Sequence, residues 1–226
     1  MSDSEVEQTK LGEWTDAEEV FAAFQGHGFT GSKEELMKLR PWHTLPWKHH
    51  ICKVKLGDDA PNSNIVLLDG SASTMHEVVE GNKPVVLLFG SITCPSMRNQ
   101  FLEEVCQIVD EFKGAVRLVF VYLAEAHPKD GWHLPLNEQQ KVVVDQHTTI
   151  EERIASAKRL KETFPNTEME VVVDSIDNNS DFHYEAQSSR IYVIYEEKIA
   201  YQSHMGPFQI SPSSLQAFLW EWSVLV

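Results

Sequence analysis

The stretch that decides the fold is Pro84-Val-Val-Leu-Leu-Phe-Gly-Ser-Ile-Thr-Cys94-Pro-Ser-Met97. The apolar run at 85–89 predicts a β-strand that is buried on both faces, because it is short and ends at a glycine. Pro95 is typical of the first turn of a helix, where its missing N–H leaves no hydrogen bond unmade. The stretch therefore predicts a buried strand that delivers Cys94 to the start of a helix spanning 96–112.

This placement favours a reactive thiol. The free N–H groups and the positive end of a helix dipole stabilise a thiolate, which is the nucleophilic form of cysteine. Most free cysteines are instead small buried hydrophobic residues. We favour the reactive interpretation of Cys94 because its position supplies a physical reason for a lowered pKa.

The segments on either side alternate between strand and helix patterns. Short runs rich in β-branched or aromatic residues predict strands at 65–68, 85–89, 115–123, 169–173, 191–195 and 199–201. Helical patterns occupy 96–112, 150–164 and 211–222. We therefore expect an α/β fold with a mixed sheet flanked by helices, a parallel centre and an antiparallel edge hairpin. This order of elements resembles the thioredoxin fold.

Residues 1–50 differ from the rest of the chain. Capping boxes at Thr15-Asp-Ala-Glu18 and Ser32-Lys-Glu-Glu35 precede apolar helical faces. A proline-broken aromatic linker follows. We expect 1–50 to be a small helical N-terminal extension and 51–226 to be the catalytic domain.

Composition limits the partners and the compartment. The 226 residues are 42% hydrophobic, which is enough for one sizeable core, and 34 acidic against 19 basic side chains give a net charge of −15. This charge argues against binding to nucleic acid or to an anionic membrane surface. Apolar runs are too short to span a bilayer, and no signal peptide pattern is present. Three scattered cysteines point to a reducing compartment, so we expect a soluble, cytoplasmic protein.

Several motifs in order resemble one family. A thioredoxin-type dithiol needs a second cysteine at the position of Met97, so Cys94 is a single-thiol centre. The opening Gly57-Asp-Asp-Ala-Pro61 and Ile65-Val-Leu-Leu-Asp-Gly70 resemble peroxiredoxins and glutathione peroxidases. Phe89-Gly-Ser-Ile-Thr-Cys94-Pro, Tyr122-Leu-Ala-Glu-Ala-His-Pro-Lys-Asp-Gly-Trp132 and Gln146-His147 together resemble the iodothyronine deiodinases. This resemblance runs from about residue 52 to residue 222.

The resemblance implies a role for each matching residue. Cys94 stands where the family carries selenocysteine, the nucleophile that attacks iodine. Ser91 matches a serine linked to proton supply, and Thr93 matches the threonine before the nucleophile. The catalytic hydrogen-bond network and the substrate contact would come from four further residues, namely Glu125, His127, His147 and Arg190.

The resemblance also implies partners. The substrate would be an iodinated phenol or thyronine of thyroid hormone metabolism, and the family forms homodimers. The reductant would be an external thiol, either a small one or a thioredoxin-like protein, and we expect no cofactor and no metal ion. The residue types also suit this reaction without reference to the family, since reductive dehalogenation needs a soft nucleophile and an acid. Histidine suits the acid role, and Glu125 is expected to hold a neighbouring histidine protonated.

Two departures from the family affect turnover. Sulfur replaces selenium at Cys94, so we expect slower catalysis, and Thr167 stands where we align the family's resolving cysteine. Cys106 lies roughly 18 Å along the same predicted helix, beyond disulfide reach of about 7 Å. A contribution from Cys52 stays open. Two other functions also stay open, a thiol peroxidase working through a sulfenic acid and a catalytically idle binding protein, favoured if Cys94 titrates like an ordinary thiol.

Overall fold

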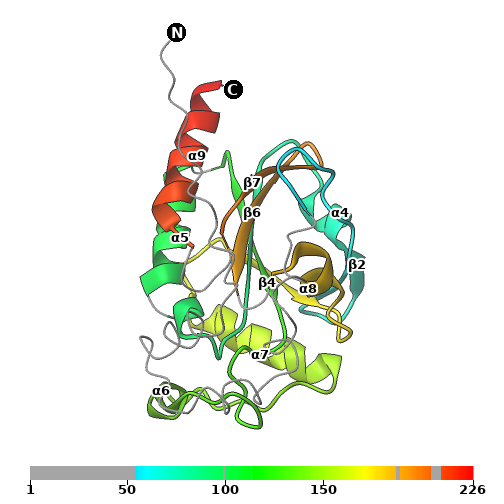
Figure 1. Cartoon of the computed structure of the whole chain (residues 1–226), viewed down its shortest axis with the longest axis vertical. Coiled ribbons are helices and arrows are strands. Elements are labelled where there is room, and N and C mark those ends of the chain that lie inside the picture. The colour runs from blue at the N-terminus through cyan, green and yellow to red at the C-terminus, as the bar shows by residue number, and fades with distance from the viewer. Residues whose placement is uncertain (1–53, 99, 113, 187–188, 205–209, 226) are drawn as a thin grey trace, which may run out of the picture. The chain divides into compact units, whose positions relative to one another are not determined.

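The computed structural model describes residues 54–98, 100–112, 114–186, 189–204 and 210–225 (Figure 1). These residues form one seven-stranded sheet with helices on both faces. The predicted α/β class with a mixed sheet is therefore confirmed. The helical extension expected over 1–50 and the cysteine Cys52 lie outside the described residues.

The sheet has the strand order β2-β1-β5-β4-β3-β6-β7. Its central strands β3, β4 and β5 are parallel, whereas β6 and β7 form an antiparallel hairpin at one edge and β1 and β2 form another at the opposite edge. All six predicted strands are present with ends shifted by at most two residues. The strands are β1 (Asn64–Leu67), β2 (Ala72–Thr74), β3 (Val85–Gly90), β4 (Arg117–Tyr122), β5 (Glu170–Asp174), β6 (Arg190–Tyr195) and β7 (Lys198–Gln202).

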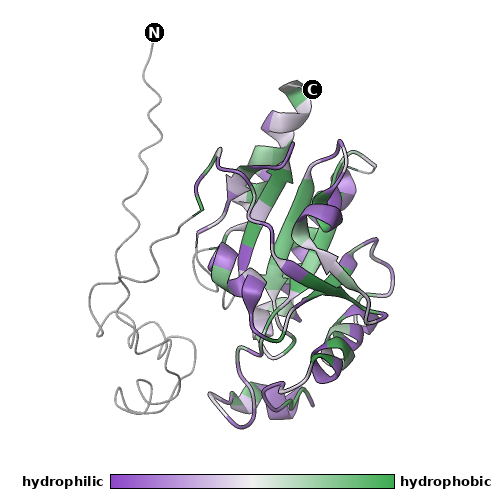
Figure 2. Cartoon of the chain, turned by 90° about the vertical axis from the view of Figure 1, so that its right-hand side faces the viewer, coloured by the Kyte–Doolittle hydropathy of each residue, from purple (hydrophilic) through white to green (hydrophobic). Residues whose placement is uncertain are grey.

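The central strand is buried on both faces, as its apolar run predicts. All six residues of β3 are buried, and alternate side chains enter separate cores because successive residues of a strand point to opposite faces. Val86 and Leu88 belong to one core, and Val85, Leu87 and Phe89 belong to the other. Figure 2 shows the resulting band of hydrophobic strands between more polar helices.

Helices cover the two faces unequally. Residues of α5, α7 and α9 complete one core, and residues of α4 and α8 complete the other. In Figure 1, α5 and α9 lie side by side on one side of the sheet, and α4 and α8 lie on the other. The helices are α4 (Met75–Val79), the 3₁₀ helix η2 (Pro95–Met97), α5 (Gln100–Glu111), α6 (Pro135–Gln139), α7 (Ile150–Glu162), α8 (Asn179–Tyr184) and α9 (Pro212–Leu225). No helix in this described part is long and apolar enough to cross a lipid bilayer.

The helix predicted at 96–112 is divided. A three-residue 3₁₀ turn, η2, follows Cys94, and the regular helix α5 begins only at Gln100. Met97 is fully buried against Gly90, where an added Cβ would lie only 2.6 Å from its Cγ. Glycine at position 90 therefore leaves the space that the Met97 side chain occupies, and any larger residue would have to displace that side chain.

Four short elements have no counterpart in the sequence-based prediction, namely β2, α4, α6 and α8. The signal for α4 is present in the chain, since Thr74 and Glu77 form a capping box at its start. Elements of three to six residues bury too few side chains to show a clear period.

Candidate active site

The candidate site lies where two parallel strands end. The turn with Cys94 follows β3, and the segment with Glu125 and His127 follows the neighbouring β4. The amide of Leu123 donates to the carbonyl of Gly90 over 2.8 Å, which continues the pairing past the strand ends. Carboxyl ends of adjacent parallel strands share one edge of a sheet, so residues about 30 positions apart meet there.

Glu125 is the centre of a buried hydrogen-bond network. Its side chain is fully buried, and the Thr93 hydroxyl donates to its Oε2 over 2.5 Å while the Thr93 amide donates over 3.1 Å. Its Oε1 accepts from the Tyr122 hydroxyl and lies 3.4 Å from His147 Nε2. The carboxyl group therefore joins β4, the Cys94 turn and the loop before α7.

Thr93 and Ser91 attach the Cys94 turn to the segment after β4. The Oγ1 of Thr93 accepts from the His127 amide over 3.0 Å, and the Oγ of Ser91 accepts from the Ala126 amide over 2.9 Å. Both hydroxyls also form hydrogen bonds with Glu125 that lower the pKa of its carboxyl group against the larger effect of burial. The structure thus joins four of the residues selected from the sequence by hydrogen bonds, namely Ser91, Thr93, Glu125 and His127.

His127 is held from the opposite side by the loop that follows it. Its Nδ1 lies 3.2 Å from the carbonyl oxygen of Trp132, and the two rings meet edge to face with centroids 4.4 Å apart. The ring is buried. The Asp-Gly-Trp part of the motif therefore fixes the orientation of this histidine.

His147 joins the network in a neutral form. Its Nε2 lies 2.9 Å from the hydroxyl of Ser156 on α7, and burial lowers the pKa of His147 to about 4, with a further contribution from the nearby Arg153. Burial also raises the pKa of Glu125. The expectation that Glu125 keeps this histidine protonated is therefore wrong, because desolvation favours the neutral form of both groups.

Cys94 is less ionised than its position in the chain suggests. Only 1% of the residue is exposed, and burial raises the pKa of its thiol above the ordinary value, although hydrogen bonds from Ser96 and the charge of Arg98 act in the opposite direction. The expected lowering of the pKa by a helix N-terminus is therefore wrong. The turn after Cys94 is only three residues long, so desolvation exceeds its dipole.

Arg190 opens β6, where it pairs with Phe89 of β3. Its guanidinium donates to the carbonyls of Ser203 and Glu185 and lies 5.5 Å from the centroid of the Tyr192 ring. These contacts join β6 to β7 and to the end of α8. The role of Arg190 in substrate binding remains a proposal.

Thr167, which was aligned with the family's resolving cysteine, lies far from Cys94. Thr167 and Cys106 line the same cavity of about 170 Å³, beside the starts of β4 and β5. Thr167 precedes the start of β5, whereas Cys94 follows the other end of the parallel β3, and the paired run from Glu170 to Val173 alone spans roughly 10 Å of strand. A cysteine at position 167 would therefore be out of reach, and burial raises the pKa of Cys106 to about 11.

Several residues at the site have no role that was predicted from the sequence. Tyr122 lies inside the quoted motif, so its proximity to Glu125 could have been anticipated. No local signal marks Arg98, Asn137 or Arg153, because they form hydrogen bonds with residues that are distant in the sequence.

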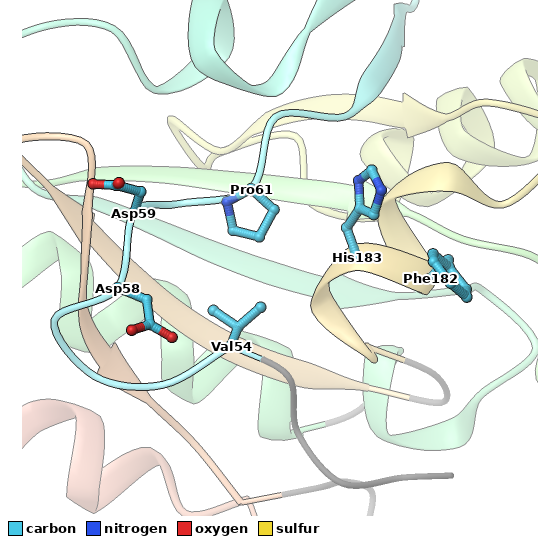
Figure 3. A pocket seen from close by; sticks show the side chains of 6 residues that line it. All are labelled: Val54, Asp58, Asp59, Pro61, Phe182 and His183. Carbon is cyan, nitrogen blue, oxygen red and sulfur yellow. The ribbon is translucent and has the colours of Figure 1, made fainter.

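A separate cavity lies away from the candidate site. It measures about 280 Å³ and lies between the segment before β1 and helix α8, as Figure 3 shows. Its lining residues are Val54, Asp58, Asp59, Pro61, Phe182 and His183. None of the sequence-selected site residues is among them. Over 54–98, 100–112, 114–186, 189–204 and 210–225, no group of three or more His, Cys, Asp or Glu side chains is arranged to hold a metal ion.

The sheet topology and the single cysteine between β3 and α5 define a single-thiol protein of thioredoxin-like fold. The sequence model for iodothyronine deiodinases matches residues 34–222. The chain belongs to this family and is therefore an oxidoreductase.

Similar proteins include three curated deiodinases. Rat type II iodothyronine deiodinase is 33% identical over 183 residues, covering 74% of this chain and 68% of the relative. The human type II enzyme is 33% identical over 196 residues, with 76% and 71% covered. Type I iodothyronine deiodinase from Xenopus laevis is 34% identical over 181 residues, with 80% and 69% covered. Among solved structures, a thioredoxin-like protein from Aeropyrum pernix superimposes with a TM-score of 0.47 at 13% identity, covering 70% of this chain and 88% of that one.

The buried histidine predicts acid sensitivity. Because the pKa of His147 falls from about 6.5 in the unfolded chain to about 4 when folded, the unfolded chain binds more protons between these values. The free energy of unfolding should therefore decrease by up to about 3 kcal/mol as the pH falls through this window. Glu125 has the opposite effect on the free energy of unfolding, since its pKa is raised on folding and the folded chain then binds more protons.

Comparison of the wild type with His147→Gln isolates the histidine contribution. Urea unfolding at pH 7, 6, 5 and 4.5 should show that the wild type loses stability more steeply than the variant. Parallel curves for the two proteins would contradict the neutral buried state of His147.

Proposed function

We propose that this chain removes iodine from iodinated phenols or iodothyronines, with Cys94 as the nucleophile and an external thiol as the reductant. The observation that carries the proposal is the direct attachment of the Cys94 turn to Glu125 and His127 through Thr93. A nucleophile and a set of proton-carrying groups are thereby held in one rigid unit, as a dehalogenation requires.

The reaction proceeds in two stages. The thiolate sulfur of Cys94 takes the iodine, so that an S–I bond forms, the C–I bond breaks and the ring carbon gains a proton. The external thiol then attacks the sulfur, releases iodide and forms a mixed disulfide. A second thiol reduces this disulfide to free Cys94, so two reductant thiols are oxidised for each iodide released.

Glu125 is the proposed proton store. Burial raises the pKa of its carboxyl group and favours the protonated form, which the Thr93 and Tyr122 hydroxyls contact directly. His127 lies one residue beyond Ala126 on the same segment and is proposed to pass the proton to the ring carbon. This arrangement assigns the acid role to the carboxyl group and the histidine together.

The raised pKa of Cys94 sets the expected pH dependence. A thiol whose pKa is raised above its ordinary value is mostly protonated at pH 7. The rate of iodide release should therefore increase by up to about tenfold per pH unit from 7 to 9. This dependence also accounts for the slow turnover expected when sulfur replaces selenium.

The test is an assay of iodide release from several iodinated phenols and thyronines, with and without a dithiol, beside an assay of peroxide loss. We expect dithiol-dependent iodide release that His127→Ala lowers by roughly 10²-fold. His183→Ala, which alters the distant cavity, is the matched control and should keep the wild-type rate.

Rapid peroxide consumption without iodide release would instead establish a thiol peroxidase. If neither activity is seen, the protein is an idle binding protein. Full activity of His127→Ala would show that the proposed proton path is wrong.

A further inference from the structure

Arg98 ends the turn that carries Cys94 and folds back along it. Its amide donates to the carbonyl of Pro95 over 3.2 Å, and its Nη1 donates to the carbonyl of Ile92 over 2.5 Å. One residue therefore bonds to the backbone both before and after Cys94. The turn is closed around the cysteine by these two contacts.

Asn137 extends this closure to the rest of the site. It is fully buried on α6, and its Oδ1 accepts from Arg98 Nη2 over 2.8 Å. Its Nδ2 donates to the carbonyl of Thr93 over 3.0 Å and to that of His127 over 3.4 Å. Gln140 Oε1 lies 2.5 Å from the same Arg98 Nη2 and fixes the guanidinium from the end of α6. The Cys94 turn and the segment that carries His127 are thereby both attached to the short helix α6.

We infer that Arg98 is a positioning residue that, together with Asn137, holds Cys94 against the His127 segment and supplies the cation that stabilises the Cys94 thiolate. The inference rests on the proposed role of Cys94 as the nucleophile. A guanidinium suits this task because its planar fork serves three acceptors at once while its charge remains.

The electrostatic surroundings agree with this role. The titratable groups that act on Arg98 are Cys94 from its own turn, Tyr122 and Glu125 from β4 and the segment after it, and Arg159 from α7. Glu125 is favoured in its neutral form by burial. Arg98 is the charged side chain that lowers the pKa of the Cys94 thiol and so opposes the effect of burial.

The experiment measures the alkylation of Cys94 by iodoacetamide as a function of pH, with the modified peptide quantified by mass spectrometry. In Arg98→Gln the midpoint should rise by about one pH unit, so that alkylation at pH 8 becomes about tenfold slower. Arg117→Gln is the matched control, because Arg117 also binds two backbone carbonyls and one side chain, but at the start of β4. Its midpoint should equal that of the wild type.

An unchanged midpoint in a folded Arg98→Gln protein overturns the inference. If that variant does not fold, Arg98→Lys decides the question. Its more mobile ammonium should raise the midpoint by a few tenths of a unit and lower iodide release by about tenfold, and wild-type values of both would overturn the inference. Alkylation needs no iodinated substrate, so the role of Arg98 is tested even if the protein releases no iodide.

Discussion

Cys94→Ser is expected to lower thiol-dependent iodide release by roughly 10³-fold or more. A serine hydroxyl is nearly the same size as the thiol, but it is a hard nucleophile that does not ionise in the working pH range. The measurement is iodide release with a dithiol present, at pH 8 and pH 9, where the wild-type thiolate fraction is larger. The free energy of unfolding should change by less than about 1 kcal/mol, because the side chain is small and the turn is held by its neighbours.

Cys106→Ser is the matched control for this substitution. Cys106 is also a buried free cysteine, but it lies on α5 and lines the cavity beside the starts of β4 and β5. This variant should keep the wild-type rate. Equal iodide release by Cys94→Ser and the wild type would remove the basis of the proposed mechanism.

Glu125→Gln is expected to lower iodide release by roughly 10²-fold while the protein stays folded. Glutamine has the shape of the protonated carboxyl group, but it carries no transferable acid proton. Its amide oxygen can accept from Thr93 in place of the carboxyl Oε2, and its NH₂ group then faces the Tyr122 hydroxyl, which can turn to accept from it. Because burial favours the neutral carboxyl group, a neutral amide should cost little stability. Iodide release and urea unfolding are measured on the same preparations.

Glu125→Ala separates the structural from the chemical role of this residue. It leaves the Thr93 and Tyr122 hydroxyls without their carboxyl acceptor in the buried site, so the free energy of unfolding should fall by about 2–5 kcal/mol. If Glu125→Gln destabilises the protein as strongly as Glu125→Ala, the carboxyl group is ionised in the folded state. Full activity of Glu125→Gln would exclude Glu125 as the proton store.

The strands and the main helices could be predicted because their patterns are local. A continuous apolar run indicates a central strand wherever it occurs, and a capping box marks a helix start without regard to distant residues. The division into η2 and α5 was not predicted, because the helical pattern over 96–112 does not mark it.

Local sequence patterns are enough to predict the α/β fold, the single-thiol character of Cys94 and the motifs that place Ser91, Thr93, Glu125 and His127 at one sheet edge. The pKa shifts of the buried groups and the hydrogen bonds that hold the Cys94 turn depend on tertiary packing. Burial raises the pKa of the Cys94 thiol and lowers that of the His147 ring, because segments far apart in the sequence exclude water from both groups. Arg98 and Asn137 acquire their roles for the same reason, since hydrogen bonds across 39 to 44 positions have no local pattern. Desolvation is a property of the packed chain, and a pattern of residue types does not contain it.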